Sequence, residues 1–158
     1  MGLFDFILEP VSLSVSKKDL VGNLQKASTY LKMMEDVVDE KHKVAEYRGK
    51  IDKTIEVLTL PKTVVKDLKT VLKIAKAVSD LREIHYLRAN PQKAALAFGQ
   101  LFAGIGKLSH YLPPPVSSYF EIFAEAEMFF ENIRKKSDPR VHMREPGVLE
   151  ATGMDYDF

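Results

Sequence analysis

Apolar residues in the first third of the chain recur at alternating steps of four and three, which places them on one face of an α-helix. This stripe consists of Leu20, Leu24, Ala27, Leu31, Met34 and Val38. A polar run, Asp39–Lys43, follows it, and the apolar set resumes in a different phase from Val44 to Leu58. A straight helix over residues 18–58 would be about 60 Å long, against roughly 40 Å for a compact chain of this size. We therefore predict a bend or break within residues 39–49, with Gly49 as the other candidate hinge; otherwise the helix projects as an arm of an elongated or oligomeric particle.

Prolines divide the rest of the chain into three more predicted helices. Leu60-Pro61 ends the first unit, and a stripe running from Val64 to Val78 predicts a helix over residues 62–87. Asn90-Pro91 indicates an N-cap followed by proline at the first helical position, which predicts a helix over residues 91–111. After three consecutive prolines, residues 116–135 predict a helix whose inward-facing residues are Tyr119, Phe120, Phe123, Phe130 and Ile133.

The two ends of the chain carry weaker signals. Pro10 is expected to stop a single N-terminal helical turn, and the alternation of Val11–Ser16 predicts a short extended lead-in without a partner strand. Proline, glycine and acidic residues in the last segment indicate an extended tail, with one turn near residues 148–152. We therefore expect an all-α fold: a single-domain bundle of four to five helices over residues 1–135, with a C-terminal aromatic-rich helical hairpin, and an extended tail over residues 136–158.

The amino-acid composition excludes several kinds of active site. The chain has 158 residues, 46% of them hydrophobic, a net charge of +1 and no cysteine. Thiol catalysis and thiolate metal sites are therefore excluded, and the near-neutral charge disfavours a protein whose whole surface binds nucleic acid. No nucleophile, phosphate-loop, dinucleotide or metal-ligand pattern occurs, because the four histidines are scattered and Gly104–Lys107 lacks the flanking residues of a phosphate loop. We expect no cofactor, no metal and no enzyme activity, with a small enzyme of dispersed site as a third hypothesis.

A row of lysines is the first feature that could carry an interaction. The row steps by four, three, four and three, which aligns its members on one face of a helix: Lys62, Lys66, Lys69, Lys73 and Lys76. One interpretation is a solvated outer face, and the other is contact with an anionic partner, either lipid headgroups or an acidic protein. Nucleic acid is the third choice, since the row contains no arginine.

The predicted helix over residues 91–111 carries a row of small residues, Ala95, Gly99, Ala103 and Gly106. Such a row permits close approach of a neighbouring helix, in the same domain or in a second copy of the chain. The alternative is an apolar hairpin, residues 91–134, that is shielded in solution and inserts into a bilayer. The layout resembles that of helical pore-forming toxins. Gln100 and Lys107 weigh against insertion, because polar groups are costly at bilayer depth.

Apolar residues also lie near both termini. The opening Gly2–Leu8 resembles that of short amphibian membrane-active helical peptides and, less closely, of viral fusion peptides. Its apolar members either cover the bundle or contact a partner or membrane: Leu3, Phe4, Phe6 and Ile7. At the other end, Tyr156 and Phe158 lie two residues apart at the free C-terminal carboxylate, and this tail either frays or enters a groove by strand addition or carboxylate capture.

These features favour a non-enzymatic protein that binds another protein, as an adaptor, chaperone-like or immunity-type factor. The alternative is a membrane-active helical protein that docks through the lysine row and inserts its N-terminus or the hairpin. The sequence shows neither a signal-peptide pattern nor a membrane-spanning run of about 18 apolar residues. A cytoplasmic location is therefore expected, with signal-independent export and homo-oligomerisation left open.

Overall fold

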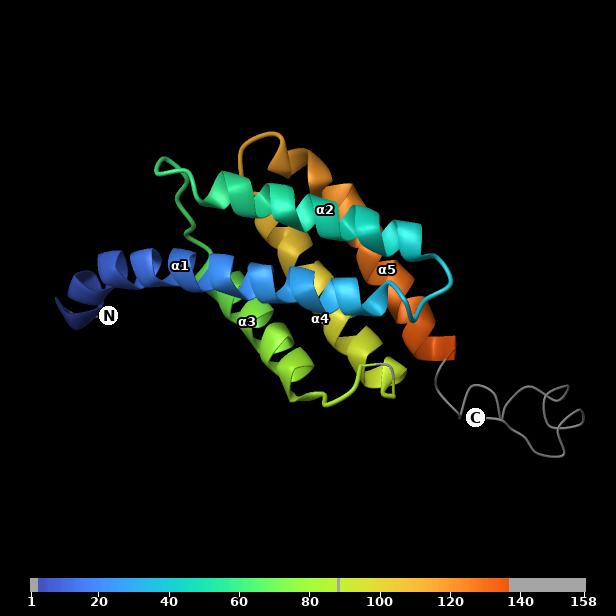
Figure 1. Ribbon diagram of the computed structural model, residues 1–158. Helices are drawn as coiled ribbons and strands as arrows, with labels where there is room; N and C mark the ends of the chain where they lie inside the picture. The colour runs from blue at the N-terminus through green and yellow to red at the C-terminus, as the bar shows by residue number, and fades with distance from the viewer. Residues whose placement is uncertain (1–2, 88, 137–158) are drawn as a thin grey trace, which may run out of the picture.

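The computed structural model describes residues 3–87 and 89–136, with side chains from Lys17 onward. Over these residues every regular secondary-structure element is a helix, which confirms the all-α prediction. The elements are α1 (Leu3–Met34), α2 (Lys41–Leu58), α3 (Leu68–Glu83), α4 (Pro91–Ser109), the 3₁₀ turn η1 (Val116–Tyr119) and α5 (Phe120–Lys136), shown in Figure 1.

The helices form two layers. Helices α1 and α2 run side by side in one layer, and α3, α4 and α5 cross behind them in the other (Figure 1). Helix α4 lies in the middle of the second layer, where it packs against α3 on one side and α5 on the other. Helix α1 rests on α3, while α2 contacts α5 and η1.

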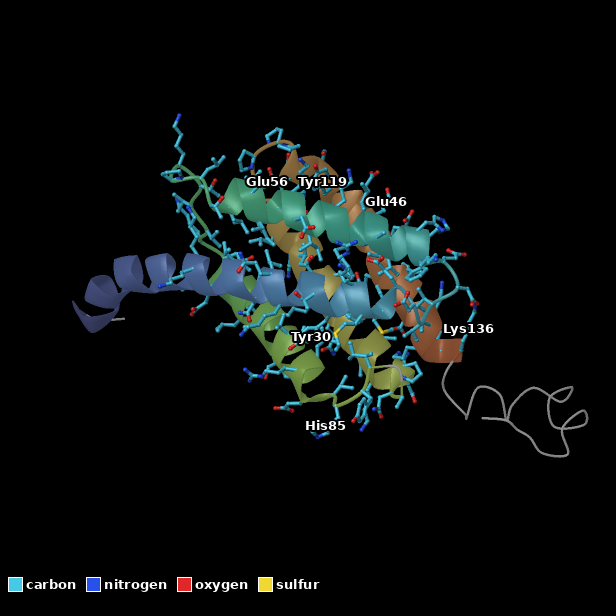
Figure 2. All side chains as sticks on the ribbon, in the orientation of Figure 1. Tyr30, Glu46, Glu56, His85, Tyr119 and Lys136 are labelled. Atoms are coloured by element: carbon cyan, nitrogen blue, oxygen red, sulfur yellow. The ribbon has the colours of Figure 1, made fainter. Side chains whose placement is uncertain are left out.

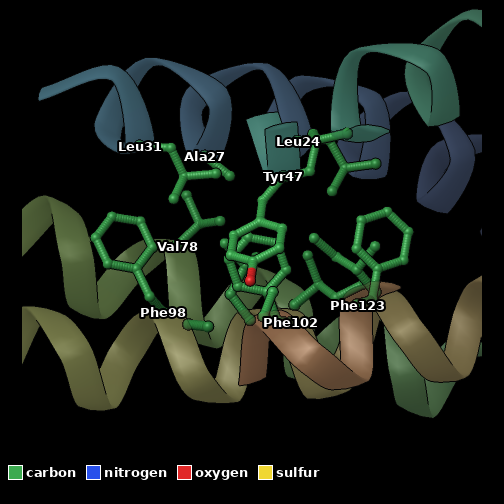
Figure 3. Close-up of a cluster of buried hydrophobic side chains, with 14 of the residues drawn as sticks. Leu24, Ala27, Leu31, Tyr47, Val78, Phe98, Phe102 and Phe123 are labelled. Carbon is green, nitrogen blue, oxygen red and sulfur yellow. The ribbon is translucent and has the colours of Figure 1, made fainter. Parts of the chain in front are cut away.

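The core is centred on α4, in which 12 of 19 residues are buried. Around Phe102 the rings of Tyr47, Phe123 and Phe130 lie with centroids 5.7, 6.0 and 5.7 Å away, so aromatic side chains from α2, α4 and α5 meet in the centre of the molecule (Figure 3). Such aromatic contacts add to the hydrophobic stabilisation of the buried rings. The aromatic-rich hairpin of α4 and α5 is thus confirmed as the centre of the bundle.

The predicted break in the helical segment 18–58 is confirmed, but it begins earlier than residue 39. Helix α1 ends at Met34, whose carbonyl accepts from the backbone N–H groups of Val37 and Val38, and α2 begins at Lys41. Val38 continues the apolar stripe because this turn folds it back against the core. The choice of Gly49 as a hinge was wrong, since Gly49 lies inside α2.

Helix α3 begins at Leu68 and not near residue 62. Asp67 is its N-cap, because its carboxylate accepts from the backbone N–H of Thr70 at 3.0 Å and from the Thr70 hydroxyl at 2.6 Å. The preceding residues form a loop, which is held by a hydrogen bond of 2.7 Å from the Thr63 hydroxyl to the Val57 carbonyl. As a result Val64 is 58% exposed, contrary to the predicted stripe, and Val65 is buried in its place.

The N-terminal prediction also needs correction. Helix α1 continues without interruption through Pro10 and the Val11–Ser16 segment, so neither the single turn nor the extended lead-in exists. A lone extended segment leaves its backbone N–H and C=O groups unpaired, whereas one proline inside a helix removes only one helical hydrogen bond. The first turns of α1 extend past the other helices at the left of Figure 1.

Candidate interaction surfaces

The small residues of α4 serve close packing inside the domain. A methyl group added at Gly104 would lie 2.8 Å from Cγ1 of Ile74 on α3, and one at Gly106 would lie 3.4 Å from Cβ of Phe123 on α5. Ala95 and Gly99 are buried as well. The predicted row therefore lets α5 approach α4 closely through Gly99 and Gly106, while Gly104, outside that row, does the same for α3, and the apolar face of the hairpin is used as core. Among the helices of residues 3–136 that the structure describes, none has both the length and the apolar character needed to cross a bilayer.

The lysine row is divided between a helix and a loop. Lys69, Lys73 and Lys76 lie exposed on α3, as predicted, but Lys62 and Lys66 lie in the preceding loop, because Asp67 starts the helix. The prediction of one continuous helical row was therefore wrong. Lys76 pairs with Asp80 at 3.1 Å, and the other four lysines form no ion pair with any described residue.

The loop before α3 carries exposed apolar residues beside its lysines. Leu60 and Val64 are 54% and 58% exposed, and Tyr111, at the end of α4, is 66% exposed. Val64, Lys66 and Tyr111 line one shallow depression of about 520 Å³, which places the two segments together. We call Leu60, Lys62, Val64, Lys66 and Tyr111 the loop-end surface.

The loop-end surface is tied to α1 by Lys17. Its ammonium group donates to the carbonyl oxygens of Leu60 at 2.8 Å and Thr63 at 2.7 Å. The first turns of α1, which contain the predicted contact residues Leu3, Phe4, Phe6 and Ile7, extend from this same end of the molecule (Figure 1). The side chains of these four residues lie outside the described set, as do Tyr156 and Phe158 with the whole segment 137–158.

A groove at the opposite end of α2 was not predicted. It has a volume of about 590 Å³ and lies between the α1–α2 turn and α5. Its apolar lining includes Met34, Val37, Val38, Pro91, Met128, Phe129 and Ile133. Its polar lining includes three carboxylates, from Asp39, Glu40 and Glu125, and two ammonium groups, from Lys43 and Lys136.

Tyr47 and Glu125 hold α2 against α5 beside this groove. The buried Tyr47 hydroxyl donates a hydrogen bond of 2.7 Å to Oε2 of Glu125, and the Tyr47 ring lies 5.7 Å from the ring of Phe129. Burial, followed by the hydrogen bond and the negative charge of Glu125, raises the pKa of Tyr47 well above its usual range. The phenol therefore stays protonated, as a fixed donor to the carboxylate.

Part of this groove has a signal in the sequence. Residues Glu125, Met128, Phe129, Asn132, Ile133 and Lys136 recur at steps of three and one, as a second face of α5 beside the core face. The facing wall has no such signal, because residues 35–40 form a turn whose path depends on tertiary packing. Figure 2 shows that the cyan turn between α1 and α2 lies beside α5.

Two further observations describe the polar groups of these residues. Over the part of the chain that the structure describes, no cluster of three or more histidine, aspartate or glutamate side chains could hold a metal ion. Every buried side-chain nitrogen or oxygen among the described residues has a hydrogen-bond partner. Comparison of the chain with protein-family models, with curated proteins and with solved structures finds no match.

Proposed function

We propose that this protein is a non-enzymatic interaction module that binds an apolar, basic helical segment of a partner protein in the groove between the α1–α2 turn and α5. The observation that carries the proposal is the second face of α5. Unlike the face that forms the core, this face opens to solvent, and Met128 on it is 62% exposed.

The dimensions of the groove favour a helical segment. The lining residues of α5 lie between Glu125 and Lys136, which are eleven residue steps apart and therefore about 16 Å apart at 1.5 Å per step. An amphipathic helix that lays its apolar face into a groove uses anchors at i, i+3, i+4 and i+7, which is the same spacing that α5 offers. Three turns of α5 can thus pack against a partner helix of similar length.

The side chains of the groove favour apolar anchors with nearby positive charge. Met128 is exposed and unbranched, so it can adapt its shape to an incoming side chain, while the buried Met34 forms the floor beneath it. Glu40 is engaged with Lys43 at 3.5 Å, and Glu125 accepts only the Tyr47 hydroxyl among the described side chains. Asp39 and Glu125 are therefore available to a lysine or arginine of the partner.

A photo-crosslinking amino acid at position 128 tests this proposal in cells that produce the protein. Met33, which is 54% exposed on α1 and outside the groove, is the matched control position. We expect position 128, and not position 33, to form one discrete adduct whose partner peptide contains apolar residues at helical spacing with lysine or arginine. A synthetic copy of that peptide should bind the purified protein and lose at least about tenfold in affinity with Met128→Glu, but not with Met33→Glu.

Three results would contradict the proposal: equal adducts from both positions, an adduct that maps to an acidic or non-helical segment, or a peptide whose binding ignores Met128→Glu. A small apolar molecule recovered in the groove in place of a peptide would also contradict it. Because Met128 is exposed, both glutamate variants should keep the helical content and melting temperature of the parent protein.

A further inference from the structure

Exposed apolar and basic side chains meet at the end of the molecule where α2 ends and α3 begins. On the loop-end surface, Leu60, Val64 and Tyr111 are each more than half exposed. Lys62 and Lys66 are exposed in the same loop as Leu60 and Val64, and Lys69 and Lys73 are exposed on α3, which follows the loop. Asp67, the nearest carboxylate in sequence, is occupied by the Thr70 N–H and hydroxyl groups at the helix start.

The backbone of α1 extends from the same end. Lys17 marks the point where α1 crosses the loop, since its ammonium group binds the Leu60 and Thr63 carbonyls. The fourteen helical residues before it would extend about 21 Å, and Figure 1 shows the first turns beyond the other helices. Their sequence, residues 3–16, contains eight leucine, phenylalanine, isoleucine and valine residues, two acidic residues, Asp5 and Glu9, and no basic residue, so the positive charge at this end comes from the lysines of the loop and of α3.

We propose that this end of the molecule is a peripheral contact site for an anionic lipid bilayer, in which the lysines meet the headgroups while the apolar residues of the loop and of the first turns of α1 enter the interface. The contact is interfacial, in agreement with the finding that no described helix can cross a bilayer. This inference is independent of the partner groove, which lies at the other end of α2, about 27 Å away along its 18 residues.

Three observations favour a lipid surface over an acidic protein or nucleic acid. The cations of this end are lysines, which act as point charges, whereas paired recognition of single phosphates or carboxylates favours arginine. The apolar residues interleaved with them are exposed and lie on a protruding loop. An apolar helix beside a basic patch supplies the two components, burial and charge attraction, that together give stable attachment to a membrane surface.

The test is flotation of the purified full-length chain with vesicles. One set of vesicles contains phosphatidylcholine alone, and the other contains about 30% phosphatidylserine. We expect flotation with the anionic set only, and we expect it to weaken when the salt concentration rises from about 0.1 M to about 0.5 M. Failure of the wild-type chain to float with anionic vesicles, or equal flotation with both sets, would overturn the proposal.

Two pairs of charge substitutions separate the site from general attraction. In Lys62→Gln/Lys66→Gln the partition coefficient should fall about 25-fold, at about fivefold per lysine. The control, Lys26→Gln/Lys32→Gln, removes the same charge from exposed positions of α1 away from the loop and should change partitioning by less than about threefold. Equal losses in the two pairs would show attraction without a site and would overturn the proposal.

Two further variants test whether apolar side chains contribute to bilayer binding, and whether a second copy of the chain covers the loop-end surface instead. Val64→Ser/Tyr111→Ser and, separately, Phe4→Ser/Ile7→Ser should each reduce flotation at raised salt. If Val64→Ser/Tyr111→Ser instead converts a dimer to a monomer and leaves flotation unchanged, the surface is an interface between two copies of the chain and the proposal fails. Met128→Glu should float like the wild type, so failure of the groove proposal would leave this result unaffected.

Discussion

The hydroxyl of Tyr47 on α2 donates to the carboxylate of Glu125 on α5 over 2.7 Å, and this bond joins the two layers of the bundle beside the groove. The Tyr47 ring is buried against Phe102 and Phe129, so the phenol is held in place by packing as well as by the hydrogen bond. A rotation of α5 that moved Glu125 would therefore also disturb the aromatic core. This relationship gives the groove a rigid wall.

Tyr47→Phe should lower the free energy of unfolding by about 1 kcal/mol at neutral pH, because Glu125 is exposed and water replaces its lost donor.

The dependence of the unfolding free energy on alkaline pH tests the role of Tyr47 more directly. The raised pKa of Tyr47 means that its contribution is complete below the ordinary tyrosine pKa of 10.0 and is lost as pH rises above it, when the unfolded chain ionises first. Urea unfolding should thus show a smaller alkaline loss in Tyr47→Phe than in the wild type, whereas Tyr86→Phe, at a 74% exposed residue, should follow the wild type. Identical profiles for Tyr47→Phe and the wild type would contradict the assigned role.

Asp67→Ala should cost about 1 kcal/mol of stability, because it leaves the first backbone N–H groups of α3 without their cap. Hydrogen bonds from the Thr70 side chain and backbone lower the pKa of Asp67 below its usual 3.8. Its contribution is therefore present above that value and is lost as pH falls through the lowered pKa. Asp67→Asn keeps an oxygen acceptor, so it should retain much of the stability at neutral pH and flatten the acid dependence. An acid unfolding profile of Asp67→Asn equal to that of the wild type would count against the cap.

The helices of the core could be predicted from the sequence because their apolar faces repeat at the helical period. Leu20, Leu24, Ala27, Leu31 and Met34 are all fully buried, as their stripe indicates. The start of α3 could not be predicted from the same rule, because Val64 and Leu68 continue the stripe while Asp67 caps the helix between them. A side chain that satisfies the first N–H groups fixes the helix start more strongly than periodicity does. Similarly, Phe120 has the period of an inward residue but is 43% exposed, since it lies where η1 joins α5.

The candidate surfaces were predictable to different degrees. The exposed lysines follow from charge and spacing alone, and each of the five is exposed. The groove depends on the distance between Met34 and α5, which a turn of six residues sets and no local pattern encodes. The loop-end surface required the start of α3 to be known, because a helix over residues 62–67 would have turned Val64 inward. Surfaces formed between segments distant in sequence therefore emerged only with the fold.

Two glycine substitutions should have opposite effects on stability. Gly104→Ala places a methyl group 2.8 Å from Cγ1 of Ile74, and the strain of overpacking should cost about 1–3 kcal/mol. Gly49 has no atom within 4 Å of an added methyl group and lies inside α2, so Gly49→Ala should stabilise the protein by up to about 1 kcal/mol. Thermal and urea unfolding measure both changes. Stabilisation by Gly104→Ala would show that α3 and α4 are not packed as closely as described, and destabilisation by Gly49→Ala would show that the Gly49 backbone leaves the helical conformation.

Lys17→Met should loosen the loop before α3 and leave the bundle intact. The substitution removes two hydrogen bonds from an ammonium group to the Leu60 and Thr63 carbonyls but keeps a side chain of similar length. The Leu60 carbonyl lies in an exposed residue and can bind water, whereas Thr63 is only 8% exposed, so the global loss should be about 1–2 kcal/mol. Locally, amide hydrogen exchange in residues 60–66 should become about tenfold faster, while exchange in the buried residues of α4 stays unchanged. Lys18→Met is the matched control, since Lys18 is exposed one position further along α1 and bonds no described residue. Equal acceleration in the two variants would show that positive charge at this end, and not the pair of bonds from Lys17, governs the loop.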